Sequence, residues 1–329
     1  MEKIYPKKLE SGDSIAVIAP SMSMALIGDD CKTYSKKYFE NELGLKVTFS
    51  NNAEELDDFK SSSIQSRVED LHNVFLDSNV KAIFTIIGGF NCNQMLDYID
   101  WDIIKNNPKI VCGYSDITAL NNAIYAKTGL VTYSGPHYST FGQKELDPYT
   151  PEYLRKCLFK DTSFEIVPSK RWTDDAWYRD QDNRNYIEND GYWIVNEGKA
   201  EGTILGANLC TFNLLQGTQY MPSLDNSILF LEDDSESKLG NFDRDLHSII
   251  HQKNFDKVRG IVIGRFQKNS DISKEEFKMM IKNKRELENI PIVANVDFGH
   301  TDPKIAFPIG GECTLETIDN KCKILITKH

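Results

Sequence analysis

Short apolar runs alternate with segments of helical periodicity through the first half of the chain. The run 82–87 is apolar almost throughout, whereas Ile64, Val68, Leu71 and Phe75 recur at helical spacing and form one stripe. Strands buried on both faces and joined by crossover helices form a parallel sheet covered by helices. We therefore expect an N-terminal α/β domain with strands at 14–19, 45–50, 82–87 and 109–112, and helices at 31–43, 64–76, 93–99 and 117–126.

The second half of the chain has a mixed pattern, with more strands and a less regular alternation. Its tail, 305–327, predicts short strands around Gly310 and Gly311. This pattern favours a second, β-rich domain. The expected strands are 193–195, 203–205, 228–231, 260–263 and 292–296, and the expected helices are 209–215 and 242–251.

A polar segment, 168–191, separates the two patterns and has no sustained period. Loops of this length are usually functional lids or disordered linkers, and Trp172 and Trp177 are unusual choices for a disordered linker. We interpret the segment as a lid. The predicted organisation is an α/β domain over 1–167, the lid over 168–191 and a β-rich domain over 192–329.

Composition narrows the class of protein. The 329 residues carry a formal net charge of −11, which argues against a protein that grips nucleic acid polymers or anionic membranes. The longest apolar run is far shorter than a membrane-spanning helix. The seven cysteines are an odd count without a Cys-x-x-Cys pair, which fits a reducing cytoplasm, and Cys112 is expected to be a buried structural thiol.

The strongest local chemical signal is Gly-Tyr-Ser-Asp at 113–116, between an apolar strand and a helix. A turn of this kind lifts the Ser115 hydroxyl above the sheet, where helix N-terminal amides face it, as a nucleophile requires. The alternative is that Ser115 or Asp116 only caps the helix. Ile117 replaces the second glycine of the usual nucleophile elbow, which disfavours a standard α/β-hydrolase.

A second turn, Gly88-Gly89, ends the preceding strand at the same edge of the sheet. Glycine permits a backbone conformation in which the Gly89 amide faces an oxygen bound beside Ser115. Together with the amide of Asp116 it would form an oxyanion hole. The alternative is an ordinary glycine turn; neither turn has the residues of a phosphate-binding loop.

A serine nucleophile needs a base and an acid that orients the base. His300 lies in a polar turn after the run 292–296, at a strand end, while His137 is the reserve base or a pocket residue. Glu232 ends the run 228–231 and is the candidate acid. A metal site of Glu232, Asp234, His300 and Asp302 is the alternative, although the chain has no paired-histidine helix motif.

Eight short motifs occur in order along nearly the whole chain. In this combination the chain resembles the serine peptidase family that contains the bacterial LD-carboxypeptidases and the microcin C immunity protein MccF. The motifs are Ile-Ala-Val-Ile-Ala-Pro-Ser at 15–21, Gly-Gly at 88–89, Gly-Tyr-Ser-Asp at 113–116, Gly-Pro-His at 135–137, Gly-Ala-Asn-Leu at 206–209, Phe-Leu-Glu-Asp at 230–233, Gly-Arg-Phe at 264–266 and Phe-Gly-His-Thr at 298–301.

The resemblance implies a Ser115, Glu232 and His300 triad, an oxyanion hole at Gly89 and Asp116, and no metal or organic cofactor. It also implies an N-terminal domain like class I glutamine amidotransferases, a homodimer, and a site between the two domains. Within the family, 172–177 looks like the tryptophan-bearing loop of the MccF branch, where an aromatic ring stacks on a nucleobase. Trp172, Trp177, His137, Asn208 and Lys238 are therefore candidate substrate contacts.

Three functions remain open at this stage. The first is MccF-type hydrolysis of a peptidyl nucleotide, a detoxification reaction. The second is LD-carboxypeptidase trimming of murein tetrapeptides, and the third is a catalytically silent protein that closes two domains on a peptide.

Overall fold

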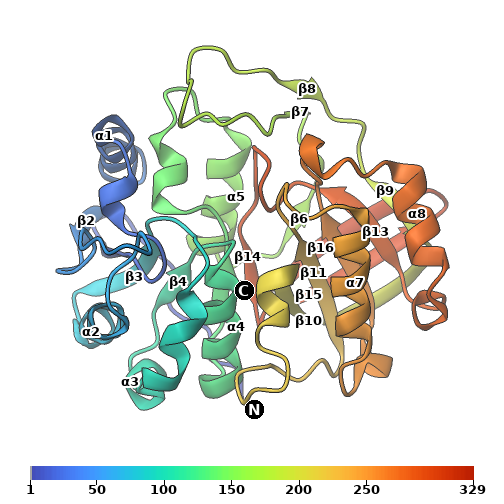
Figure 1. The fold of residues 1–329 in the computed structure, drawn as a ribbon, viewed down its shortest axis with the longest axis horizontal. Coiled ribbons are helices and arrows are strands. Elements are labelled where there is room, and N and C mark those ends of the chain that lie inside the picture. The colour runs from blue at the N-terminus through green and yellow to red at the C-terminus, as the bar shows by residue number, and fades with distance from the viewer. Residues whose placement is uncertain (1) are drawn as a thin grey trace.

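The computed structural model describes residues 2–329, and five strands of its first half form a six-stranded sheet with one strand from near the C-terminus (Figure 1). The strand order is β14-β5-β4-β3-β1-β2, in which all neighbours are parallel except β14 and β5. Apolar residues of β1, β3 and β4 are buried, as expected for a sheet with both faces covered. The strands are β1 (Ser14–Ile18), β2 (Lys46–Phe49), β3 (Val80–Thr85), β4 (Ile110–Cys112), β5 (Thr132–Ser134) and β14 (Phe307–Ile309).

Helices flank this sheet, so the predicted N-terminal architecture is confirmed. The helix at Ile64–Leu76 has the predicted bounds, and Cys112 is buried. The segment expected as a helix at 93–99 is instead a 3-10 helix, in which Cys92 and Met95 are buried at the three-residue spacing of that helix type. The helical elements are η1 (Met24–Leu26), α1 (Asp29–Lys37), the π-helical η2 (Tyr38–Glu42), α2 (Ile64–Leu76), η3 (Cys92–Tyr98), α3 (Trp101–Asn106), α4 (Ile117–Thr128), η4 (Tyr138–Gly142) and α5 (Tyr149–Leu158).

The second half forms an eight-stranded sheet in the order β6-β16-β15-β10-β11-β12-β13-β9. Its centre, β10 to β13, is parallel, and the outer strands are antiparallel, which gives the expected β-rich domain. The elements are β6 (Phe164–Ile166), β9 (Trp193–Asn196), β10 (Gly198–Asn208), α6 (Leu209–Asn213), β11 (Ser227–Glu232), α7 (Leu239–Ile250), η5 (Phe255–Lys257), β12 (Gly260–Gly264), η6 (Lys268–Ser270), α8 (Lys274–Lys282), η7 (Arg285–Leu287), β13 (Ile292–Val296), β15 (Glu312–Ile318) and β16 (Lys321–Lys328).

The two sheets exchange one strand each. Strand β6 precedes the segment 168–191 but belongs to the second sheet, and β14 lies near the end of the chain but pairs with β5 in the first. A division of the chain at 167 and 192 therefore does not separate the sheets completely. The exchange fixes the two halves against each other.

The segment 168–191 arches over the two halves (Figure 1). Its two ends pair as a short hairpin of β7 (Arg171–Trp172) and β8 (Ile187–Glu188), and Thr173 is fully buried. Most of the other residues between 170 and 191 are exposed or half-buried, whereas Thr173 is held against Asp302 by two backbone hydrogen bonds.

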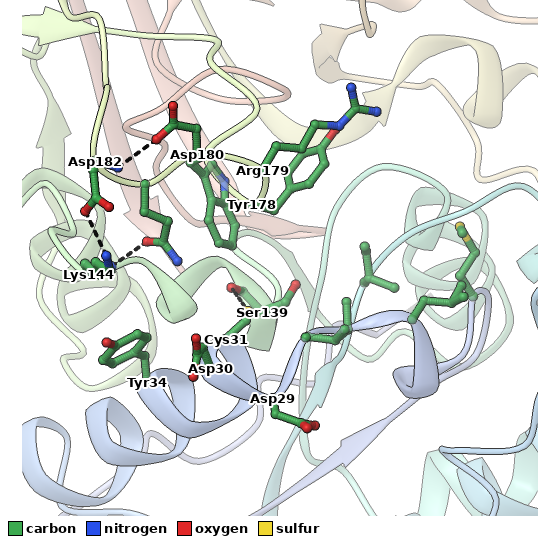
Figure 2. A pocket seen from close by; sticks show the side chains of 17 residues that line it. Asp29, Asp30, Cys31, Tyr34, Ser139, Lys144, Tyr178, Arg179, Asp180 and Asp182 are labelled. Atoms are coloured by element: carbon green, nitrogen blue, oxygen red, sulfur yellow. Dashed lines mark hydrogen bonds and ion pairs between the residues drawn. The ribbon is translucent and has the colours of Figure 1, made fainter.

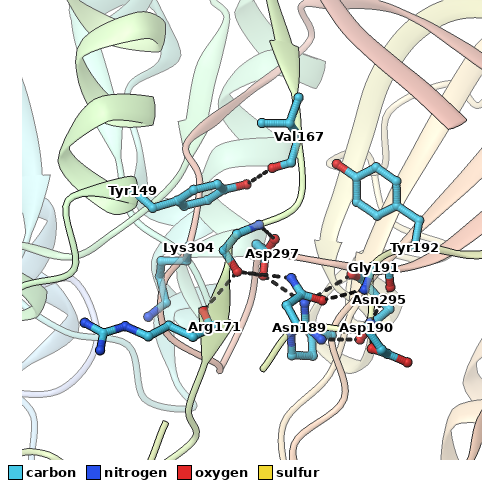
Figure 3. A network of polar contacts seen from close by, with 12 residues as sticks. Tyr149, Val167, Arg171, Asn189, Asp190, Gly191, Tyr192, Asn295, Asp297 and Lys304 are labelled. Carbon is cyan, nitrogen blue, oxygen red and sulfur yellow. Dashed lines mark hydrogen bonds and ion pairs between the residues drawn. The ribbon is translucent and has the colours of Figure 1, made fainter. Parts of the chain in front are cut away.

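A buried polar network ties both ends of this segment to the second sheet (Figure 3). The Ser169 amide and hydroxyl both donate to the carboxylate of Asp297 at 2.8 Å, and Arg265 pairs with the same carboxylate at 2.9 Å. At the other end, the Asn295 side chain donates to Asp190 and to the Gly191 carbonyl. The hairpin therefore has fixed ends. Within residues 2–329, no helix has the length and apolar character needed to cross a bilayer.

Candidate active site

The serine predicted as nucleophile lies in a tight turn at the carboxyl end of β4. Ser115 has a φ of +60°, a left-handed conformation that is uncommon for a residue with a side chain. Gly88, in the loop after β3, leaves room for this turn, because a Cβ at position 88 would lie 2.9 Å from the Ser115 Cβ. Strained backbone of this kind clusters at functional sites, where surrounding structure must hold it in place.

His300 and Glu232 converge on this serine from the second domain. The His300 Nε2 lies 3.1 Å from the Ser115 Oγ, and its Nδ1 lies 2.8 Å from the Glu232 Oε2. Glu232 is the last residue of β11, and His300 follows β13, so both come from carboxyl ends of parallel strands. One imidazole thus bridges a hydroxyl and a carboxylate across the two domains.

The carboxylate of Glu232 is itself held on two sides. Asn208, its direct register partner on β10, donates from Nδ2 to the Glu232 Oε1 at 3.2 Å and to the Asp233 Oδ1 at 3.3 Å. On the other side, Gly299 has a φ of +96°, and a Cβ there would lie 2.4 Å from the Glu232 Oε2. The position of the carboxylate therefore depends on Asn208 and on the missing side chain at 299.

Replacing Gly299 by alanine should lower turnover on the order of a hundredfold, because the new methyl group displaces the carboxylate that orients His300. The backbone strain alone should cost about 1 kcal/mol of folding free energy. Gly12→Ala is the matched control, since Gly12 has the same φ of +96° with no heavy atom within 4 Å of its Cβ. Turnover and thermal unfolding of both variants are the measurements. Equal turnover in the two variants would show that the position of the Glu232 carboxylate does not affect the rate.

The electrostatics of His300 suit a proton acceptor. Burial by itself lowers the pKa of this imidazole, but the charge of Glu232 and the hydrogen bond to it outweigh burial and raise the pKa. The side chain is 19% exposed, whereas that of Glu232 is 2% exposed. Glu232 therefore stabilises the protonated form of His300.

The two amides expected to form an oxyanion hole belong to the turns around the serine. A Cβ at Gly88 would lie 3.0 Å from the Ser115 Oγ and 3.5 Å from the Asp116 nitrogen, and Gly89 follows with a φ of +152°. Among the hydrogen bonds of residues 2–329, neither the Gly89 amide nor the Asp116 amide donates to another group. The side chain of Asp116 does not cap α4, so that alternative for Asp116 is wrong.

The two tryptophans of the 168–191 segment face different cavities. Trp177 lines a cavity of about 830 Å³ between this segment and the first domain, together with Tyr34 and Lys144 (Figure 2). Met22 and Ile87 also line it, and Met22 donates to the carbonyl of Gly88, so this cavity reaches the Gly88-Gly89 turn. Trp172 instead lies over Arg265, whose guanidinium carbon is 5.0 Å from its ring centre.

The other candidate contacts lie at varying distances from the serine. His137 is buried, its Nδ1 is 2.7 Å from the Thr85 Oγ1, and its ring centre lies 4.4 Å from that of Tyr114, with the ring planes tilted. Burial lowers the pKa of this imidazole well below its ordinary value. Lys238 is exposed at the start of α7 and forms no ion pair within the part of the chain described. Sequence reasoning missed Tyr114, whose ring lies 5.3 Å from that of His300.

The carboxylates of the alternative metal site have other partners. Asp302 pairs with the buried ammonium of Lys304, and Glu232 bonds His300. No group of three histidine, cysteine or acidic side chains arranged to hold a metal ion occurs between residues 2 and 329. The side chains of Glu232, His300 and Asp302, which the metal-site hypothesis would use as ligands, are thus engaged in ion pairs and hydrogen bonds.

Family models match both halves of the chain. The model for the LD-carboxypeptidase N-terminal domain matches residues 15–135, and that for the LD-carboxypeptidase C-terminal domain matches 201–315. The chain is 52% identical to the "Putative carboxypeptidase YocD" of Bacillus subtilis over 99% of this chain and 100% of that protein. It is 29% identical to the Escherichia coli microcin C7 self-immunity protein MccF, covering 98% and 95% of the two chains. The "Probable murein peptide carboxypeptidase" of Bacillus subtilis is also 29% identical, over 97% and 93%.

Solved structures give the same picture. An MccF-like protein from Bacillus anthracis superposes with a TM-score of 0.98 at 52% identity, over 99% of this chain and 100% of that one. MccF in complex with aspartyl sulfamoyl adenosine superposes with a TM-score of 0.88 at 28% identity, over 99% of both chains. Other MccF structures include a tryptophan-to-phenylalanine mutant bound to adenosine monophosphate.

Proposed function

The chain belongs to the LD-carboxypeptidase family, and we propose that it is a serine hydrolase of MccF type, cutting the link between an aminoacyl or peptidyl group and a nucleotide. Its role would be detoxification of microcin C-like antibiotics. The observation that carries the proposal is the chain of hydrogen bonds from Ser115 through His300 to Glu232. No cofactor is needed for this chemistry.

The hydrogen-bonded residues Ser115, His300 and Glu232 account for each proton transfer in the reaction. His300 takes the hydroxyl proton as the Ser115 oxygen attacks the carbonyl carbon, and the amides of Gly89 and Asp116 stabilise the oxyanion. Collapse of the tetrahedral intermediate breaks the bond to the leaving group, which receives the proton from His300. Water then adds to the acyl-enzyme, with His300 again as base, and releases the acid and free Ser115.

Two observations support a nucleotide as the leaving group. The 830 Å³ cavity is large enough for a nucleotide-sized ligand and has an indole, that of Trp177, in its wall. MccF, a relative over almost its whole length, has been solved with aspartyl sulfamoyl adenosine. A nucleobase stacked on an indole gains on the order of 1 to 3 kcal/mol without any sequence code.

Replacing Trp177 by alanine should raise KM for aspartyl sulfamoyl adenosine about tenfold or more, through the loss of stacking. Trp172→Ala is the comparison: Trp172 lies on Arg265 and does not line this cavity, so KM should change less than about twofold. Steady-state kinetics of both variants decide the matter. A larger KM effect at Trp172 would assign the nucleobase to a separate cavity of about 590 Å³ that Trp172 lines together with Arg265.

Trimming of murein tetrapeptides is the second candidate, favoured by the similarity to a murein peptide carboxypeptidase. The same Ser115 chemistry would release D-alanine from a muropeptide. Parallel assays with a muropeptide and with aspartyl sulfamoyl adenosine separate the two functions. D-alanine release without hydrolysis of the nucleotide substrate would replace the first proposal with the second.

We also propose that the protein works as a cytoplasmic homodimer on small substrates. The role proposed for Lys238 in holding a substrate anion belongs to the same proposal, because an MccF active-site mutant changes a serine, an asparagine and a lysine together. Asn208 could take part only if its amide left Glu232 and Asp233, to which it donates. Sedimentation analysis tests the dimer. A single species of one chain's mass, 37.5 kDa, would remove it.

A further inference from the structure

The motif at 15–21 ends in a serine whose hydroxyl lies under the proposed oxyanion hole. Ser21 is fully buried, and its Oγ donates to the Asp116 Oδ2 at 2.5 Å. The same carboxylate oxygen accepts the amide of Cys92 at 2.8 Å. Asp116 thus joins three loops that follow β1, β3 and β4, all at one edge of the parallel sheet.

These contacts involve the two residues whose amides would bind the oxyanion. One amide belongs to Asp116, whose side chain Ser21 and Cys92 hold. The other belongs to Gly89, whose backbone packs against Ser21 so closely that a Cβ there would lie 2.3 Å from the Ser21 Oγ. The hydroxyl of Ser21 therefore contacts both residues at once.

Buried groups around Ser21 keep it in place. Its carbonyl accepts the Ser61 hydroxyl at 2.5 Å, and the guanidinium of Arg67 donates to the carbonyls of Pro20 and Asn91. Burial raises the pKa of Asp116, while the Ser21 hydroxyl, the amides of Cys92 and Asn91 and the charge of Arg67 act in the opposite direction. A carboxylate this deeply buried depends on its hydrogen bonds to stay charged.

We propose that Ser21 is a positioning residue for the oxyanion hole: it fixes the amides of Gly89 and Asp116 through its contacts with both residues. The inference rests on the proposed serine-hydrolase function. Ser21 does not touch the reacting atoms, so its loss should act on the transition state and leave ground-state binding almost unchanged.

Ser21→Ala should lower kcat about tenfold to a hundredfold, with KM changed less than about twofold, because one oxyanion donor is commonly worth a hundredfold or more. Phosphonylation of Ser115 by a fluorophosphonate should slow by a similar factor, since it places a developing oxyanion in the same position. This second readout does not depend on the natural substrate.

Ser23→Ala is the matched control. Ser23 is a buried serine two residues along the same loop, but its hydroxyl bonds the Ala53 carbonyl and does not touch Asp116. Its rates should stay near those of the wild type. A double-mutant cycle adds a second test: the effects of Ser21→Ala and Asp116→Asn should be less than additive, whereas those of Ser23→Ala and Asp116→Asn should add.

The outcomes separate this inference from the proposed function. A wild-type protein that neither reacts with the fluorophosphonate nor hydrolyses substrate overturns both. A reactive wild type with an equally reactive Ser21→Ala variant overturns the role of Ser21 alone. If Ser21→Ala does not fold, Asp116→Asn decides instead: a lower kcat at constant KM supports the network, and unchanged kinetics overturn it.

Discussion

Replacing Ser115 by alanine should leave a folded protein whose turnover is reduced at least about a thousandfold. The Oγ of this residue is the atom that would attack the carbonyl carbon, and it lies 3.1 Å from the Nε2 of His300. Alanine removes only the hydroxyl. The backbone turn should keep its conformation, because the left-handed residue Ser115 still packs closely against Gly88. Hydrolysis of aspartyl sulfamoyl adenosine and of a muropeptide is the measurement.

A matched control separates loss of the nucleophile from loss of a buried hydroxyl. Ser227 is fully buried at the start of β11, the strand that ends in Glu232, and its Oγ donates to the Leu224 carbonyl at 2.8 Å. Ser227→Ala should lower stability slightly and leave turnover unchanged. Near-normal hydrolysis by Ser115→Ala would remove the serine mechanism.

Labelling with a fluorophosphonate tests the non-catalytic alternative. A protein that only closes on a peptide would bind ligand without consuming it, and its Ser115 would not react. Mass spectrometry of the labelled chain should find the phosphonyl group on Ser115 and nowhere in the Ser115→Ala variant. Ligand binding without any label would favour the silent binding protein.

The three hydrogen-bonded residues of the candidate site could be predicted because each stands at or after the end of a recognisable strand. Ser115, Glu232 and His300 stand at or just after the ends of apolar runs, and parallel strands bring such ends to one edge of a sheet. The strand positions needed only local pattern. That the edges of two different sheets face each other came from the family resemblance, since no local pattern encodes the packing of two domains.

Features that depend on contacts between distant segments could not be predicted. The exchange of β6 and β14 joins strands more than a hundred residues from their partners, and each strand is only three residues long. The hydroxyl of Ser21 meets a carboxylate 95 positions away. The motif at 15–21 did not indicate a role for Ser21, because serine is common in turns of any kind after a strand.

The anchoring of the 168–191 segment was missed for the same reason. Its composition is that of an exposed loop, and only the fold brings Ser169 to Asp297 and Thr173 to Asp302. Since Asp302 follows His300 by two residues, the segment that roofs the cavity is bonded to the turn that carries the proposed base. Two backbone hydrogen bonds therefore join the segment to the turn of the histidine.

Glu232→Gln should reduce the plateau of kcat/KM on the order of a thousandfold, since the amide no longer stabilises the imidazolium or enforces the tautomer of His300. Its effect on the pH profile has a definite sign. In the wild type the charge of Glu232 raises the pKa of His300, and only the neutral imidazole can accept the proton of Ser115. Activity therefore rises with pH as His300 loses its proton.

Without that charge, burial dominates and the pKa of His300 falls, so the acid limb of the Glu232→Gln profile should move to lower pH although its plateau is lower. Asp234→Asn is the control, because Asp234 also raises the pKa of His300 by its charge but does not bond the ring. It should move the limb slightly in the same direction and keep the plateau. A Glu232→Gln limb that stays in place or moves to higher pH would show that this carboxylate does not govern the titration of His300.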